Sequence, residues 1–202
     1  MMLRLGLTGG IATGKSAVAA MLRELRFDVL DADSLARQLI EPSQPAYHEV
    51  LREFGTSIVD SDQRIHRSKL AAIVFADPAK LARLNAILHP RVEVAVTKQF
   101  AEWSRGGTRD AVFVEAALLV EAGYLKHLDG LVVTWCRPEQ QLERLRARGF
   151  TDTDARRRIA AQLPVDDKLR HATEKIDCSG SVEETRKQVE ALAAKLRKNT
   201  TR

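Results

Sequence analysis

The chain has 202 residues, of which 45% are hydrophobic, 29% charged and 5% aromatic. This length and balance fit one globular domain with small insertions, and they exclude a disordered, collagen-like or coiled-coil protein. The net charge of +5 favours anionic partners, but the few aromatic residues argue against nucleic acid, whose bases need stacking platforms. No apolar run approaches the roughly 18 residues of a membrane span, and two widely spaced cysteines suit a reducing compartment, so we expect a cytoplasmic protein without membrane partners.

Short apolar runs bounded by turn residues are typical of buried strands, and the chain contains five of them. They cover residues 3–8, 27–30, 111–115, 131–135 and 175–177. Helical spacing follows the first run, and long helical stretches separate the later ones, which favours parallel strands joined by right-handed crossovers. The sequence therefore predicts an α/β fold with a doubly wound, parallel, five-stranded sheet.

The strongest pattern follows the first predicted strand and precedes a predicted helix. It matches a glycine, any four residues, then Gly, Lys and Ser or Thr. Its residues are Gly9, Gly10, Ile11, Ala12, Thr13, Gly14, Lys15 and Ser16. In such a loop the backbone N–H groups at a helix N-terminus surround a phosphate, the lysine adds positive charge, and the hydroxyl binds Mg²⁺. The run therefore predicts a binding site for a nucleoside triphosphate with Mg²⁺.

Two aspartates, Asp31 and Asp33, follow the second predicted strand, at the edge of the sheet where doubly wound proteins bind ligands. Side chains two positions apart on a strand point to the same side, and either carboxylate could orient a hydroxyl nucleophile or accept its proton. The alternative is that Asp33 only caps a helix that begins near Ser34. Beside a phosphate-binding loop, we favour a catalytic role for at least one of the two.

The segment 34–109 is too long to be a simple crossover between two strands. Asp77 followed by Pro78 predicts a helix start, because aspartate caps a first turn and proline fits its first position. His89 followed by Pro90 predicts a helix stop or kink, because proline cannot donate the helical hydrogen bond. We therefore expect a helical insertion between the second and third strands.

Glu115 ends the third predicted strand, at the same edge of the sheet as the glycine-rich loop. An acidic residue there could hold Mg²⁺ through water, as strand-end acids do in related NTPases. The equally weighted alternative is a solvent-facing charge at a strand end. We predict that Ser16 and Glu115 are the metal-binding residues.

The segment 137–171 is also too long for a crossover, and it is rich in arginine. Its arginines are Arg137, Arg144, Arg146, Arg148, Arg156, Arg157, Arg158 and Arg170. A transferring phosphoryl group must be shielded from water and neutralised by cations, which a mobile, arginine-rich lid would provide. Arg144 and Arg148 lie four positions apart, on one face of a predicted helix, and could meet one anion together. For any single arginine, a solvated helix face is the alternative.

Capping-box spacing marks two more predicted helix starts. Thr151 and Asp154 form one such pair within the arginine-rich segment, and Ser181 and Glu184 form another. Apolar residues after Ser181 recur on one face, so the chain is predicted to close with an amphipathic helix.

Taken in order, these motifs resemble the dephospho-CoA kinase family over nearly the whole chain. The matching runs are Leu7-Thr8-Gly9-Gly10 through Lys15-Ser16, Asp31-Ala32-Asp33 with Ala36-Arg37, Phe54-Gly55, Leu88-His89-Pro90, Leu118-Leu119 before Glu121, Gln141-Leu142 before Arg144 and Arg148, and Arg158-Ile159-Ala160-Ala161-Gln162 with Lys168. The glycine-rich loop alone would indicate only a large superfamily of NTPases, whereas the ordered set is far more specific.

The resemblance implies transfer of the γ-phosphate of ATP to the ribose 3′-hydroxyl of dephospho-CoA, the last step of coenzyme A synthesis. It also implies three regions. A P-loop nucleotide-binding core would comprise residues 1–33, 110–136 and 172–202, a helical acceptor-binding region residues 34–109, and a helical lid residues 137–171. The cofactors implied are ATP and Mg²⁺, and the partner is the small-molecule acceptor.

The resemblance further implies roles for individual residues. The catalytic set would be Asp33 as the base, Lys15, and the lid residues Arg144 and Arg148. The nucleotide would be bound by the whole loop from Gly9 to Ser16. The acceptor would be bound by Asp33, Arg37, His89 and Leu118.

Three departures from the family pattern stand out. Ala12 and Thr13 occupy positions where the family often has Gly and Ser, and because alanine disfavours positive φ we expect ordinary backbone at Ala12. Ala117 replaces the proline that commonly precedes the Leu-Leu pair. Cys178 stands near the last strand where the family usually has asparagine.

Two alternative functions stay open on sequence alone. One is another small-metabolite kinase of the same architecture, for example one acting on nucleosides or shikimate. The other is a non-catalytic, nucleotide-sensing or RNA-binding module that uses the glycine-rich loop as a switch.

Overall fold

The computed structural model describes residues 2–106 and 109–200. It contains two compact units, one formed by Met1–Asp31 with Gln99–Arg202 and the other by Ala32–Lys98. The parts of our predicted core, insertion and tail at residues 1, 107–108 and 201–202 lie outside the described residues. Among the helices that the structure describes, none is both long and apolar enough to cross a membrane.

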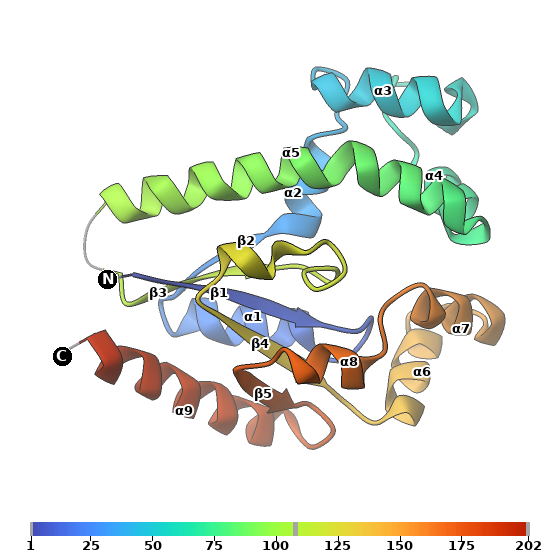
Figure 1. Ribbon diagram of the computed structural model, residues 1–202. Coiled ribbons are helices and arrows are strands. Elements are labelled where there is room, and N and C mark those ends of the chain that lie inside the picture. Colours follow the sequence, from blue (N-terminus) through green and yellow to red (C-terminus); the bar gives the residue numbers. More distant parts are fainter. Residues whose placement is uncertain (1, 107–108, 201–202) are drawn as a thin grey trace. The chain divides into compact units, whose positions relative to one another are not determined.

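The first unit is built on one all-parallel sheet, as predicted (Figure 1). Its strands are β1 (Leu3–Gly9), β2 (Asp28–Asp31), β3 (Ala111–Glu115), β4 (Gly130–Trp135) and β5 (Glu174–Asp177). They lie in the order β2-β3-β1-β4-β5, so β1 is central and pairs with both β3 and β4. Because the winding reverses beside β1, its carboxyl end lies at the switch point where doubly wound folds bind their ligands.

Two helices cover one face of this sheet, α1 (Lys15–Glu24) and α9 (Val182–Thr200) (Figure 1). Alternate residues of the central strand, Leu5 and Leu7, join the same apolar cluster as Leu22 of α1 and Val189 of α9. Strand β3 is buried along its whole length, which is typical of a parallel strand covered on both faces. The predicted capping box holds at the start of α9, where Glu184 N–H donates to Ser181 Oγ. This packing fixes the first turn of α1 against the end of β1.

The arginine-rich segment forms three helices within the first unit: α6 (Pro138–Ala147), α7 (Asp152–Ala160) and α8 (Val165–Arg170). The predicted cap is present, since Asp154 N–H donates to Thr151 Oγ1 at the start of α7. Leu145 and Ala155 are fully buried in a small apolar cluster that also contains Ala12 of the glycine-rich loop. Another short helix, η2 (Tyr124–His127), precedes β4. Helices α6 and α7 are therefore packed on the loop through their apolar side.

The second unit is helical, and its residues make a separate apolar core. Its elements are α2 (Ala32–Gln38), α3 (Pro45–Phe54), η1 (Thr56–Ile58), α4 (Arg67–Ala76) and most of α5 (Pro78–Arg105). Tyr47, Val50 and Ile58 are buried together with residues of α4. The predicted cap before α5 is present, because Asp77 Oδ1 accepts the N–H of Ala79.

One of our two expectations at Pro90, a helix stop, is wrong. Helix α5 continues through this proline for the rest of its 28 residues. Proline removes one helical hydrogen bond and crowds the preceding turn. Here the neighbouring carbonyl of Ile87 accepts a bond from Arg91 Nη1 at 2.6 Å, and Arg91 also pairs with Glu49. The bond that Pro90 cannot make is the one to the carbonyl four residues earlier, and the long helix on both sides outweighs this single missing bond.

Candidate functional site

The turn between β1 and α1 contains the whole predicted phosphate-binding run, and two of its glycines are required by close approach. Gly14 has a φ of 103° and precedes the first turn of α1. A Cβ on Gly14 would lie 2.7 Å from Cys178 Sγ, and one on Gly9 would lie 2.2 Å from Thr134 Oγ1. The first N–H groups of a helix lack intrahelical partners, and the helix dipole makes this end positive. The start of α1 is therefore suited to an anion.

The backbone at Ala12 differs from our expectation, since its φ is 62°. Residues 10–13 form a turn that is closed by a bond from Thr13 N–H to the Gly10 carbonyl. Ala12 is the third residue of this turn, and one of the common turn types requires a positive φ at that position. The Thr13 hydroxyl is buried and bonds Gly10 O at 2.8 Å and Thr134 Oγ1 at 3.0 Å. The bond to Thr134, together with the bond from Arg144 to the Ala12 carbonyl, stabilises this turn and outweighs the preference of alanine for a negative φ.

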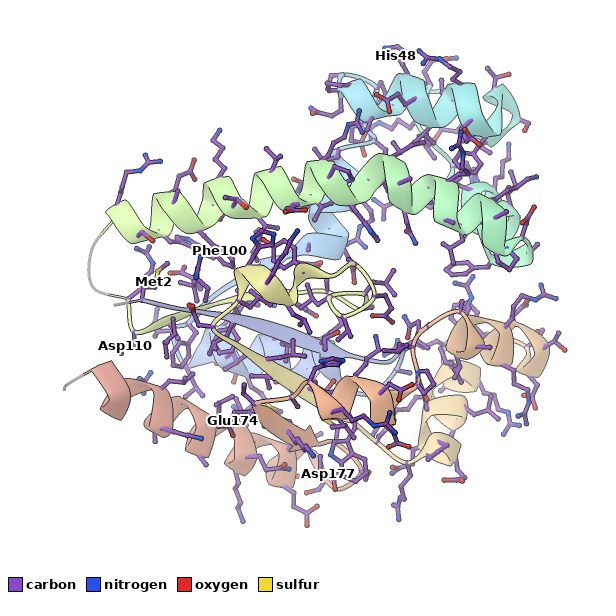
Figure 2. All side chains as sticks on the ribbon, in the orientation of Figure 1. Met2, His48, Phe100, Asp110, Glu174 and Asp177 are labelled. Atoms are coloured by element: carbon purple, nitrogen blue, oxygen red, sulfur yellow. The ribbon has the colours of Figure 1, made fainter. Side chains whose placement is uncertain are left out.

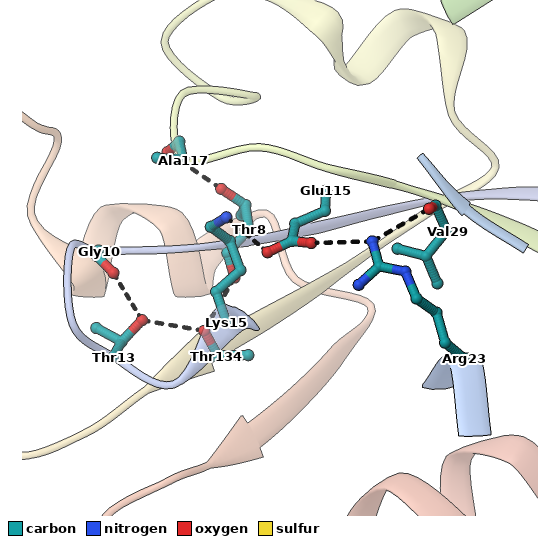
Figure 3. A network of polar contacts seen from close by, with 9 residues as sticks. All are labelled: Thr8, Gly10, Thr13, Lys15, Arg23, Val29, Glu115, Ala117 and Thr134. Atoms are coloured by element: carbon teal, nitrogen blue, oxygen red, sulfur yellow. Dashed lines mark hydrogen bonds and ion pairs between the residues drawn. The ribbon is translucent and has the colours of Figure 1, made fainter. Parts of the chain in front are cut away.

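The predicted residues Lys15 and Glu115 are in contact (Figure 3). Lys15 Nζ lies 3.0 Å from Glu115 Oε1, and the side chains are only 13% and 5% exposed. The register pairs Leu7 with Glu115, which brings the end of β3 beside the strand that enters the loop. The other carboxylate oxygen of Glu115 lies 3.5 Å from Arg23 Nη2. Glu115 is therefore an anion shared by two cations.

Arg23 was missed by sequence reasoning. It lies in the last turn of α1, about two helical turns after Lys15, and also donates to the Val29 carbonyl (Figure 3). The spacing from Lys15 was the one available signal, and by itself it does not distinguish Arg23 from an ordinary surface arginine.

The arginine-rich helices hold the glycine-rich loop by its backbone. Gln162 Oε1 accepts the N–H of Ile11 at 2.7 Å, while Gln141 Nε2 donates to the carbonyl of the same residue at 2.6 Å. Arg144 donates to the carbonyls of Ala12 at 3.2 Å and of Cys178 at 2.7 Å. The sequence suggested a role for Arg144 on an anion, but did not reveal this clamp on the loop.

A cavity of about 260 Å³ lies beside the start of α1. Its lining includes Gly14, Arg144, Arg148 and Cys178, so it brings both predicted lid arginines to the glycine-rich loop. Burial raises the pKa of the Cys178 thiol to about 11, and burial also raises the pKa of the Cys136 thiol. The Cys178 thiol is therefore neutral at neutral pH and contributes shape to the cavity rather than charge.

The turn after β5 borders this cavity and is fixed by its own hydrogen bonds. Figure 2 marks Glu174 and Asp177 at the two ends of β5. Asp177 Oδ1 accepts the N–H of Ser179 at 2.8 Å, and Gln140 donates to the Ser179 carbonyl at 2.8 Å. Helix α6 thus holds the turn in place.

The predicted acceptor-side residues are divided between the units. Asp31 pairs with Glu115 in the sheet register, and Leu118 lies in the turn after β3, both in the first unit. Asp33 and Arg37 lie in α2 and His89 lies in α5, in the second unit. Our argument that two aspartates share one side of a strand is wrong, because β2 ends at Asp31 and Asp33 already belongs to the first turn of α2. The observed strand is shifted by one residue from the predicted run 27–30, and helix α2 begins directly after it, so Asp33 is helical rather than extended.

The residues at the loop fit a magnesium nucleotide better than a metal held by protein alone. No group of three or more His, Cys, Asp or Glu residues forms a metal site within the described part of the chain. Ser16 is exposed at the second position of α1, close in sequence to Lys15. Mg²⁺ typically takes one or two protein ligands together with several waters and phosphate oxygens, and a single exposed hydroxyl such as that of Ser16 suits this coordination.

Known proteins resemble this chain over almost its full length. The model of the family described as dephospho-CoA kinase matches residues 3–184. A dephospho-CoA kinase from Carboxydothermus hydrogenoformans is 42% identical over 192 residues, which are 95% of this chain and 93% of that protein. The crystal structure of TT1252 from Thermus thermophilus is 33% identical, has a TM-score of 0.79 and covers 96% of this chain and 98% of its own.

A more distant likeness concerns the fold alone. Shikimate kinase from Acinetobacter baumannii, in complex with shikimate, has a TM-score of 0.57 at 16% identity. The match covers 100% of this chain and 97% of that one.

Proposed function

This chain belongs to the dephospho-CoA kinase family, and from that premise we propose that it transfers the γ-phosphate of ATP to the ribose 3′-hydroxyl of dephospho-CoA. The chain is thus a transferase that phosphorylates an alcohol group, at the last step of coenzyme A biosynthesis. We propose ATP with Mg²⁺ as its cofactors and a small-molecule acceptor as its partner. A cytoplasmic location is part of the proposal and agrees with two free, buried cysteines.

The observation that supports this function most strongly is the pairing of Lys15 with Glu115 at the open start of α1. A cation, a helix N-terminus and a strand-end carboxylate meet there, at the switch point of the sheet. A negatively charged phosphate chain bound at this point would be stabilised by both the helix dipole and the charge of Lys15.

In the proposed mechanism the loop positions the phosphates and neutralises charge, because phosphoryl transfer passes through a loose transition state. The loop amides and Lys15 bind the β- and γ-phosphates. To reach them, the Lys15 ammonium turns away from Glu115. Arg23 stays beside Glu115 and compensates its charge during that exchange.

Ser16 and Glu115 are the proposed metal-binding residues. The Ser16 hydroxyl would bind Mg²⁺ directly, and Glu115 would hold it through water. An ion held there would supply positive charge that neutralises the charge developing on the phosphates. Glu115 would then exchange the Lys15 ammonium for this ion as its cationic neighbour.

The arginine-rich segment 137–171 is the proposed lid. Arg144 is anchored on the backbone of Ala12 and Cys178, whereas Arg148 is exposed at the C-cap of α6. Both line the cavity at the loop, where they would neutralise the transferring group. Arg148 keeps more freedom to move than Arg144 does, because it follows the last turn of its helix.

On the acceptor side, we propose that Asp33 orients the 3′-hydroxyl for in-line attack and takes its proton late. Its place in the chain supports this, because it follows by two residues the strand end that pairs with Glu115. Arg37, His89 and Leu118 are the other proposed acceptor-binding residues. The second unit, together with the rest of segment 34–109, is the proposed acceptor-binding region.

An acceptor panel tests this function. Purified protein is incubated with ATP and Mg²⁺ plus dephospho-CoA, shikimate, a nucleoside or no acceptor, and ADP release is followed. We expect ADP release above background with dephospho-CoA alone. Faster release with another acceptor would identify a different small-metabolite kinase. ATP binding without any acceptor-dependent release would instead favour a nucleotide-sensing module.

A further inference from the structure

Lys168, in the short helix α8, is the most deeply buried charged side chain that the proposed mechanism does not use. Its side chain is 0% exposed, and its ammonium donates to the Ala117 carbonyl at 2.6 Å and to Glu121 Oε1 at 2.7 Å. The Glu121 side chain is 21% exposed. An ammonium removed from water requires such partners, because an unpaired buried charge is costly.

Stability alone does not account for this arrangement. A buried ion pair is often no more stabilising than two apolar side chains of similar volume, because both charges lose their hydration. What the ammonium offers beyond an apolar side chain is a directed bond to a backbone carbonyl. The position of that carbonyl therefore indicates what the lysine does.

The carbonyl belongs to Ala117, in the turn that joins the metal side of the site to its acceptor side. Ala117 follows Glu115 by two residues and directly precedes Leu118. Its carbonyl also accepts a bond from Thr8 Oγ1 at 3.2 Å, and Thr8 is a buried residue of β1 just before the glycine-rich loop (Figure 3). Lys168 and Thr8 thus hold the same carbonyl from two different elements.

The chain around Lys168 is tied to the loop as well. Glu121 Oε1, which accepts from Lys168, also accepts the N–H of Leu163 at 2.9 Å. The residue before Leu163 is Gln162, which bonds the N–H of Ile11. Residues 162–168 therefore contact the phosphate-binding loop at one end and the turn after β3 at the other.

We infer that Lys168 is a positioning residue, which holds the turn 116–121 so that Glu115 and Leu118 stay in register with the phosphate-binding loop. The inference rests on the proposed function, because it concerns the acceptor and metal sides of the same site. Lys168 does not touch the substrates in this account. Loss of its bond to Ala117 would displace the turn, and a misplacement of about 1 Å at a reacting centre costs up to about 100-fold in rate.

The test compares Lys168→Met with the double variant Lys168→Met/Glu121→Leu. The single variant leaves Glu121 without its ammonium, whereas the double variant removes both charges and should recover the thermal stability lost to the unpaired carboxylate. Glu121→Leu alone shows what loss of the bond from the Leu163 N–H costs. In both Lys168 variants, we expect kcat/KM for dephospho-CoA to fall about 10- to 100-fold while KM for ATP changes less than about 3-fold. The matched control is Lys195→Met, which breaks an exposed pair with Glu174 and should change neither value beyond about 2-fold.

Hydrogen exchange supplies a readout that does not depend on activity. In the structure the N–H groups of Ala122 and Tyr124 donate to the carbonyls of Leu118 and Leu119. We expect both Lys168 variants to speed exchange in a peptide covering 116–124 and to leave peptides from β1 and β4 unchanged.

The outcomes separate the inference from the proposed function. A double variant that recovers wild-type kcat/KM together with its stability would show a structural role only and overturn the inference. Unchanged exchange in the turn would overturn it as well. A wild-type protein that turns over no dephospho-CoA would contradict the proposed function, and the exchange result would then still decide whether Lys168 holds the turn.

Discussion

The two compact units treat their charged residues differently. In the first unit Lys15 and Glu115 are buried together, and Lys168 is buried against Glu121. In the second unit the ion pairs that Arg64, Arg83 and Arg91 form are more exposed. Arg83, for example, is 68% exposed where it meets Glu53.

This difference indicates where the chemistry lies. Exposed ion pairs contribute little, whereas a buried charge is kept only where several bonds compensate its lost hydration. The second unit is built on an apolar core around Val50 and Ile58. Burial of charges at the loop lowers the stability of the first unit, which agrees with a site that must neutralise phosphate.

The largest expected effect comes from removing the buried cation at the loop. Lys15→Met should lower kcat by about 1000-fold, because it deletes a donor aimed at the transferring phosphates. Arg23 still compensates Glu115, so we expect the variant to fold. Arg83→Gln in the second unit is the matched control and should stay within about 2-fold of wild type. Steady-state kinetics measure kcat for both variants, and circular dichroism checks that they fold. Equal losses of kcat in the two variants would contradict the difference between the two units.

The next effect concerns the two aspartates after β2. Asp33→Asn should lower kcat by about 100-fold, because the amide can still contact a hydroxyl but cannot take its proton. Asp31→Asn should lower it less than about 5-fold, since Asp31 ends the strand and carries no proposed role in proton transfer. Near-normal turnover by a folded Asp33→Asn protein would remove Asp33 from the mechanism.

A smaller loss is expected at the lid. Arg144→Gln should reduce kcat/KM for ATP by about 10- to 100-fold, because it removes a cation from the cavity and two bonds to backbone carbonyls. Arg146 lies two positions away and pairs with Asp152 on the surface, so Arg146→Gln serves as its control. Equal kinetics for these two variants would show that Arg144 is an ordinary surface cation.

Two substitutions in the loop test the backbone rather than the charge. Gly14→Ala should lower the free energy of unfolding by about 1 to 3 kcal/mol, because it combines a positive φ with a Cβ too close to Cys178. Ala12→Gly should change it by less than about 1 kcal/mol, since relief of the strained φ is offset by the greater chain entropy of glycine. Urea denaturation measures both, and a neutral Gly14→Ala would mean that the turn relaxes easily.

The smallest effect is a pH dependence of stability far from the site. The bonds from Arg4 lower the pKa of Asp129, so the folded state favours the carboxylate. This contribution is present above the unfolded pKa near 4 and is lost as the pH falls through the lower folded value. The pair is partly exposed, so its worth is at most about 1 kcal/mol. Unfolding of Asp129→Asn at pH 2 to 6 should show a flatter profile than wild type.

The strands and helix caps could be predicted from the sequence because their signals are local. Buried runs such as 111–115 and the caps at Asp77 and Thr151 depend on residues within one turn or one strand. The backbone at Ala12 could not be predicted, because the turn that requires its positive φ is stabilised by bonds from Arg144 and Thr134, more than 100 positions away.

The residues of the candidate site also divide into those with local signals in the sequence and those whose partners are distant. Lys15 belongs to a contiguous motif, and Glu115 ends a recognisable strand, so both could be named in advance. Arg23 and Lys168 could not be given roles, because their partners Glu115 and Glu121 lie 92 and 47 positions away in the sequence. The placement of Asp33 on the strand was wrong for a different reason, because the exact boundary between β2 and α2 carries no clear signal in the sequence.

The central claim is that the γ-phosphate of ATP reaches the ribose 3′-hydroxyl of dephospho-CoA. The most direct test follows labelled γ-phosphate from ATP with Mg²⁺ and dephospho-CoA, next to a 3′-deoxy analogue of the acceptor. The account predicts one label in CoA for each ADP formed, and none in the analogue. Label found in inorganic phosphate, with no CoA formed, would contradict it.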